Sequence, residues 1–155
     1  MDAVTDTTTV VERELEIDAS PETVWEFLVD PEKATRWMGM RATLDPRPGG
    51  EYRVEVIPGN TAVGEFLELD PPHRLVQTWG WDPSGGGDIE PGSTRIEYEL
   101  IASGDATILR FRHELPTPKA AESHGHGWDH YFERLVVAAA GKDPGVDPWI
   151  ERPMS

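Results

Sequence analysis

The chain of 155 residues contains no cysteine. Disulfide bonds, thiolate nucleophiles, and zinc or iron–sulfur sites with cysteine ligands are therefore excluded. The sequence also lacks any apolar run near the ~20 residues that a membrane-spanning helix requires. Its first nine residues contain neither the basic nor the apolar part of a secretory signal. These absences predict a cytoplasmic protein that does not insert into a membrane.

Basic residues are also scarce. Fourteen Lys and Arg residues against 29 Asp and Glu residues leave a formal net charge of −15. Such a surface repels phosphate groups, so neither nucleic acid nor an anionic membrane is an expected partner. Only three of the basic residues are lysines, and a GC-rich genome or a salt-adapted proteome would explain this bias equally well.

Motifs for nucleophilic or nucleotide chemistry are missing as well. There is no Gly-x-Ser-x-Gly elbow, and the serines at 93, 103 and 123 fall in predicted turns. The glycine run 85–87 follows a predicted strand but precedes no helix, so it does not form a phosphate-binding loop. We therefore assign no catalytic residue and expect no cofactor.

What the sequence does contain is a regular order of elements. Alternation over residues 11–17 predicts a strand, and Ser20-Pro21 and Asp30-Pro31 are typical starts of two short helices, the second ending near residue 37. Antiparallel strands are predicted at about 52–56, 61–69, 74–81, 95–100 and 109–115, with a bulge at Gly64 and a mobile loop over 82–92. An apolar stripe predicts a long helix at about 123–140, followed by a loosely held tail.

Six motifs occur in a characteristic order. They are Ile17–Trp25, Asp30–Glu32, Trp37, Asp45–Gly50, Gly64–Leu75 and His124–Trp128. Together they resemble the branch of the START-like (SRPBCC) superfamily that is named for activators of the heat-shock chaperone ATPase. The resemblance covers about residues 10–141, with 1–9 as a flexible N-terminus and 142–155 as a C-terminal tail. It implies an α+β helix-grip fold, in which a curved antiparallel sheet of six to seven strands wraps around the long C-terminal helix.

The resemblance also implies an apolar cavity between the sheet and the long helix. Side chains at inward positions of the strands, and on the helical stripe, are the candidates for lining it: Gln77, Trp79, Tyr98, Phe111, His113, His124, Trp128, Tyr131 and Phe132. Aromatic rings with polar tips suit a flat apolar ligand, and they suit a filled core equally well. The imidazoles of His113 and His124 either contact a ligand or are satisfied within the protein.

Three histidines, His124, His126 and His130, crowd into one segment and raise the question of a metal site. At 100° per residue, His124 lies on the apolar stripe, whereas His126 and His130 lie together about 160° away. A single regular helix cannot direct all three to one ion, although Gly125 and Gly127 could interrupt it. We therefore expect no metal.

Three functions are compatible with these features. We favour a binding protein for a small hydrophobic or aromatic molecule. The first alternative is a cyclase, dehydratase or hydrolase for an aromatic or polyketide-like substrate, with His113 or Tyr98 exchanging a proton. The second is a co-chaperone-like module that contacts a chaperone through its acidic surface. A second copy of the chain, in a homodimer, is a further candidate partner.

Overall fold

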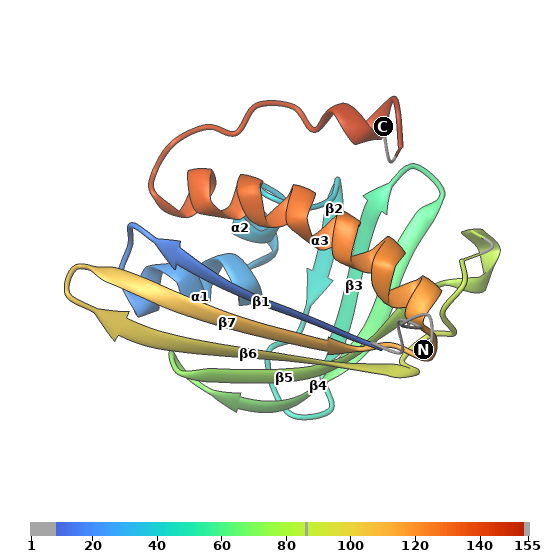
Figure 1. Ribbon diagram of the computed structural model, residues 1–155, viewed down its shortest axis with the longest axis horizontal. Helices are drawn as coiled ribbons and strands as arrows, with labels where there is room; N and C mark the ends of the chain where they lie inside the picture. The colour runs from blue at the N-terminus through green and yellow to red at the C-terminus, as the bar shows by residue number, and fades with distance from the viewer. Residues whose placement is uncertain (1–8, 86, 154–155) are drawn as a thin grey trace, which may run out of the picture.

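Seven antiparallel strands form one curved sheet that wraps around a long helix (Figure 1). The strands are β1 (Val10–Ile17), β2 (Arg41–Leu44), β3 (Glu51–Ile57), β4 (Asn60–Asp70), β5 (Arg74–Trp81), β6 (Thr94–Ser103) and β7 (Ala106–Glu114). Their order across the sheet is β1-β7-β6-β5-β4-β3-β2. The computed structural model describes residues 9–85 and 87–153. It confirms the predicted α+β helix-grip fold.

The helices begin where short polar side chains cap them. α1 (Pro21–Val29) and α2 (Pro31–Ala34) start after Ser20 and Asp30, whose side-chain oxygens accept backbone N–H groups three residues further on. α3 (Pro118–Ala139) starts five residues earlier than the apolar stripe predicts. The cause is a third cap of the same kind, because Thr117 accepts the Ala120 N–H at 3.1 Å.

The bulge in β4 lies further along the strand than the sequence predicts. The pairing of β4 with β5 shifts between Phe66 and Glu68, whereas Gly64 remains in regular pairing with β3. A Cβ atom at Gly64 would lie 2.0 Å from the carbonyl oxygen of Thr78. Glycine is required there because the two backbones approach closely, and the predicted bulge at this position is wrong.

Two segments predicted to be loose are packed against the domain. In the loop between β5 and β6, Ile89 is 2% exposed, and its carbonyl accepts the Trp81 N–H at 2.8 Å. After α3 the chain turns back and runs over the side of the helix that faces away from β1, β6 and β7 (Figure 1). There Trp149, in the 3₁₀ turn Pro148–Ile150, is 5% exposed. One large apolar side chain anchors each segment.

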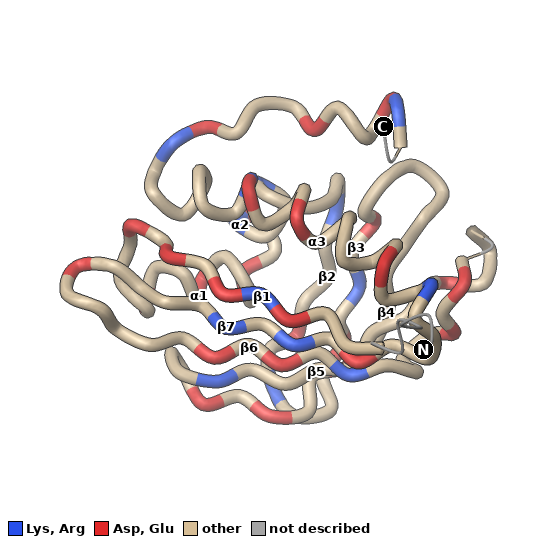
Figure 2. The backbone as a smooth tube through the Cα atoms, viewed as in Figure 1, with Lys and Arg blue, Asp and Glu red and all other residues tan. Residues whose placement is uncertain are grey.

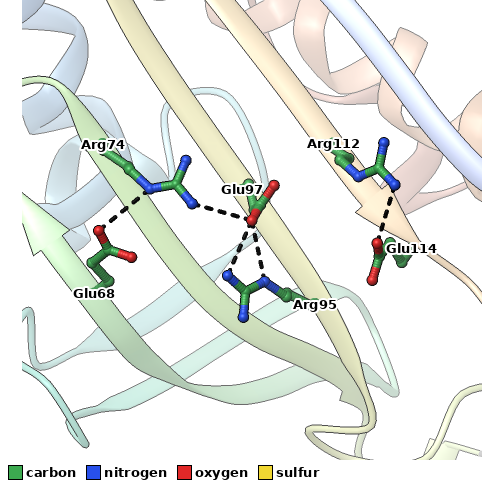
Figure 3. Close-up of polar contacts among 6 residues, drawn as sticks. All are labelled: Glu68, Arg74, Arg95, Glu97, Arg112 and Glu114. Carbon is green, nitrogen blue, oxygen red and sulfur yellow. Dashed lines mark hydrogen bonds and ion pairs between the residues drawn. The ribbon is translucent and has the colours of Figure 1, made fainter.

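The outer face of the sheet carries charges of both signs. The sign alternates from strand to strand: Arg110 and Arg112 of β7 lie between glutamates of β1 on one side and glutamates of β6 on the other (Figure 2). Figure 3 shows part of this network: Glu97 contacts Arg74 at 3.2 Å and Arg95 at 3.1 Å. Pairs of this kind at a surface contribute about 0–1 kcal/mol each. The outer face of the sheet therefore carries interleaved positive and negative side chains rather than a uniformly acidic patch.

Among the residues that the structure describes, no helix is both long enough and apolar enough to cross a membrane.

Candidate functional site

A pocket of about 260 Å³ lies between the N-terminal half of α3 and one end of β3, β4 and β5. Five aromatic side chains from three segments, β5, α3 and the C-terminal segment, form much of its wall: Trp79, Trp81, Trp128, Tyr131 and Trp149. The remaining lining residues are Met38, Val56, Ile57, Asn60, Gly87, Asp88, Ser123, His124 and Gly127. The wall is therefore largely apolar, with a few polar groups, which is the usual composition of a small-molecule site.

The nine candidate residues divide between this pocket and the adjacent core. Those that line the pocket are Trp79, His124, Trp128 and Tyr131. The others, Gln77, Tyr98, Phe111, His113 and Phe132, are buried beside it and fill the space between the sheet and α3. Phe111 is the centre of that filling, with its ring centroid 4.7 Å from Trp128 and 4.8 Å from Phe132.

His113 is fully buried, and both of its ring nitrogens are engaged by the protein. Trp128 Nε1 donates to His113 Nδ1 at 3.1 Å, since an indole N–H can only donate. The proton therefore lies on Nε2, which donates to Thr94 Oγ1 at 2.8 Å, and Thr94 in turn donates to the Trp79 carbonyl. Burial, with a smaller effect from His124, lowers the pKa of His113 to about 3. The imidazole is neutral and satisfied, so it has no free nitrogen to exchange a proton with a ligand.

His124 has a different environment, at the wall of the pocket. Its Nε2 lies 3.2 Å from one carboxylate oxygen of Asp88, which belongs to the loop between β5 and β6. Its ring centroid is 5.3 Å from that of Trp79 and 6.2 Å from that of Trp81. The helix, the loop and the sheet thus meet at this one side chain.

Deeper in the sheet, two buried donors have no hydrogen-bond acceptor within residues 9–85 and 87–153. They are Gln77 Nε2 and Trp79 Nε1. The hydroxyl of Tyr52 is close to both side chains, and burial raises its pKa in spite of these two neighbours. All three side chains are buried, and of the three only Trp79 lines the pocket.

The C-terminal segment supplies one wall of the pocket, and sequence reasoning missed it. Trp149 stacks on His130 with a centroid distance of 3.7 Å and an interplanar angle of 5°. His130 Nε2 lies 2.7 Å from Asp147 Oδ1, so a ring contact and a polar contact fix the segment together. The available signal was a tryptophan in an otherwise polar, proline-rich tail. Asp88 and Gly127 were also missed, because neither belongs to an apolar pattern.

The histidines of α3 do not converge on one point. His124 is paired with Asp88, and His130 is paired with Asp147. Within residues 9–85 and 87–153, no three His, Asp or Glu side chains are placed to share a metal ion.

Residues 18–140 match the family model described as Activator of Hsp90 ATPase homolog 1-like protein. The chain belongs to this family. The family predicted from the six motifs is thereby confirmed, together with its START-like fold. No curated protein matches the chain.

Solved structures show the same fold. An AHSA1-like protein from Rhizobium etli is 44% identical, with a TM-score of 0.72 over 90% of this chain and 87% of that one. CalU16 from Micromonospora echinospora is 26% identical, with a TM-score of 0.70 over 84% of this chain and 76% of that one. An HSP90 activator from Plasmodium falciparum is 22% identical, with a TM-score of 0.67 over 83% of this chain and 94% of that one. At that identity the last likeness concerns the fold alone.

Proposed function

We propose that the protein binds a small aromatic molecule of one or two fused rings in the pocket between α3 and β3–β5. The aromatic wall supports this class of ligand, because flat rings gain both buried area and edge-to-face contacts there. The size supports it too. A cavity of about 150 Å³ holds one benzene ring, so about 260 Å³ suits up to two fused rings rather than a long fatty acid.

Gly127 is the observation that carries this proposal. It lies in the middle of α3, where glycine costs about 1 kcal/mol relative to alanine. A Cβ atom at this position would meet no atom within 4 Å, and the residue lines the pocket. The helix is therefore weakened at a position where no packing contact requires it. A need for free volume to hold a ligand explains why glycine is present at this position.

The arrangement supports a binding role over the two alternatives. The enzyme hypothesis relied on His113 or Tyr98, and neither residue lines the pocket. The co-chaperone hypothesis relied on the net negative charge of the outer surface, whereas the outer face of the sheet interleaves arginines with glutamates (Figures 2 and 3).

The test is to fill the pocket from Gly127. Four tryptophans of this chain line the pocket or its rim, so binding of 2-naphthol can be followed by quenching of their fluorescence. We expect micromolar binding to the wild type and at least a tenfold weaker affinity for Gly127→Leu, whose side chain occupies the free volume. The matched control is Glu133→Leu, which adds the same side chain at an exposed position of α3.

Circular dichroism on each variant shows whether the fold is retained. Equal affinity of Gly127→Leu and the wild type would place the ligand elsewhere. If neither 2-naphthol nor naphthalene quenches the folded wild-type protein, the pocket does not take aromatic molecules of this size and the proposal falls.

A further inference from the structure

We infer that the pocket selects aromatic molecules that carry a hydrogen-bond donor, a hydroxyl or a ring N–H, and that His124 accepts this hydrogen bond through Nδ1. The inference rests on the proposed function, because it specifies the chemistry of the ligand in the same pocket. It depends on which nitrogen of His124 carries the proton.

Asp88 determines the position of that proton. Both carboxylate oxygens of Asp88 lie near Nε2 of His124, at 3.2 and 3.3 Å. An ionised carboxylate can only accept hydrogen bonds, so Nε2 must be the nitrogen that donates to Asp88. The other nitrogen, Nδ1, then carries a lone pair and acts as an acceptor.

Among the residues that the structure describes, none donates a hydrogen bond to Nδ1 of His124. The imidazole is nevertheless held in place, since its ring meets Trp79 at an interplanar angle of 86° and Trp81 at 34°. His113 provides the contrast within the same molecule, because both of its nitrogens are occupied.

Among the other polar groups of the wall, Asp88 is engaged with Nε2 of His124, and Asn60 and Ser123 cannot impose the same preference. Asn60 and Ser123 each offer both a donor and an acceptor, so they satisfy either kind of ligand atom. The His124 side chain is only 9% exposed, so water competes weakly at its ring. A ligand that presents only an acceptor leaves both its own oxygen and Nδ1 without a partner, and such losses weaken binding by about tenfold.

The experiment compares 2-naphthol, which has a hydroxyl donor, with 2-methoxynaphthalene, which has the same ring system and an oxygen that can only accept. Both are titrated at pH 8 by tryptophan fluorescence. We expect the wild type to bind 2-naphthol about tenfold more tightly. His124→Phe keeps a flat ring in the wall, and we expect it to lose this preference through weaker binding of 2-naphthol alone.

Asp88→Asn separates the tautomer from the shape of the pocket. The asparagine amide can either donate to Nε2 or accept from it, so Nδ1 is no longer restricted to accepting. We expect the preference for 2-naphthol to fall severalfold, through a gain for 2-methoxynaphthalene. Glu133→Leu, on the exposed face of α3, should retain the wild-type ratio.

The outcomes distinguish the two proposals. Equal affinities of the two probes for the wild type, or an unchanged ratio in His124→Phe, would overturn the role of His124 and leave the pocket as a binding site. Absence of quenching by either probe would overturn both proposals.

Discussion

At the scale of single residues, the hydrogen bonds of His113 connect four elements of the fold. Its partners are Trp128 on α3 and Thr94 on β6, and Thr94 extends the chain of hydrogen bonds to the Trp79 carbonyl on β5. Every donor and acceptor in this series of three hydrogen bonds is used, which is the condition under which a buried polar group is tolerated in a core. The hydrogen bonds of His113 therefore help to fix the position of α3 relative to the sheet.

This burial makes the stability of the protein depend on pH. The pKa of His113 is lowered to about 3, whereas an unfolded chain has the ordinary value near 6.5. Between these values the unfolded state binds the proton and the folded state does not, so stability rises with pH and is lost as the pH falls from 6.5 towards 3. Between these pH values, the titration of His113 changes the free energy of unfolding by up to about 1.4 kcal/mol per pH unit. Urea unfolding at pH 4, 5, 6 and 7 measures it.

His113→Gln is the comparison, because the amide keeps polar atoms in the site and does not titrate. We expect its free energy of unfolding to be lower at pH 7 and to change less between pH 6 and pH 4 than that of the wild type. Parallel pH profiles for the two proteins would contradict the lowered pKa of His113.

The sequence could predict the inward position of His113 but not its chemical state. Alternation in the strand places His113 on the same face as Phe111, and the helical stripe places His124 towards the sheet. Which imidazole is satisfied depends on Thr94, Trp128 and Asp88, and these partners come from other elements. Contacts of this kind follow from the packed fold and leave no local pattern in the sequence.

At the scale of elements, α3 contains two glycines that serve different purposes. A Cβ atom at Gly125 would lie 3.0 Å from the guanidinium of Arg13, which is held by Asp129 on the next turn. A Cβ atom at Gly127 would meet nothing. The first glycine allows α3 to approach β1, and the second opens the pocket.

Alanine substitution at each glycine should separate these purposes. Gly127→Ala should raise the free energy of unfolding by about 0.5–1 kcal/mol, since the helix gains propensity without a clash. Gly125→Ala gains the same propensity but displaces Arg13, and we expect no increase or a decrease. Urea unfolding at pH 7 compares the two with the wild type. A larger gain for Gly125→Ala than for Gly127→Ala would reverse the assignment.

Element boundaries were predictable where the capping pattern was explicit. Ser20-Pro21 and Asp30-Pro31 predict the starts of α1 and α2 correctly, and Thr117-Pro118 carries the same signal for α3. The start of α3 was misplaced because its first turns are exposed or packed through small residues, so that the apolar stripe becomes recognisable only later. The short edge strand β2, with four residues, has too few alternating positions to be recognised.

At the scale of the whole molecule, the position of the pocket depends on segments that return from a distance. The family motifs predict that a cavity lies between sheet and helix, but its walls at one end come from Asp88 in the loop after β5 and Trp149 after α3. Both segments are rich in proline and glycine, and such composition predicts looseness. In each segment the burial of one large apolar side chain, Ile89 or Trp149, holds the backbone in place despite this composition.

Charge also acts over the whole molecule, and it acts in two opposing ways. The net charge of −15 destabilises the compact state through repulsion between distant carboxylates. The ion pairs on the outer face, such as Arg74 with Glu97 at 3.2 Å, stabilise it locally. A chain of this length has a radius of gyration of about 15 Å, so the two effects operate over very different distances.

Salt concentration separates these two effects, because the Debye length falls from about 30 Å at 10 mM to about 10 Å at 0.1 M. The longer distance spans the molecule, whereas the shorter one still exceeds the separation within an ion pair. We therefore expect the free energy of unfolding in urea to rise between 10 mM and 0.1 M NaCl.

Glu16→Gln should raise the free energy of unfolding at 10 mM NaCl, since no basic side chain in the described part of the chain pairs with this exposed glutamate. Glu97→Gln removes the same charge but breaks two pairs, so it should stabilise less or destabilise. A fall in stability with added salt, together with equal effects of the two variants, would show that local pairing outweighs the net repulsion.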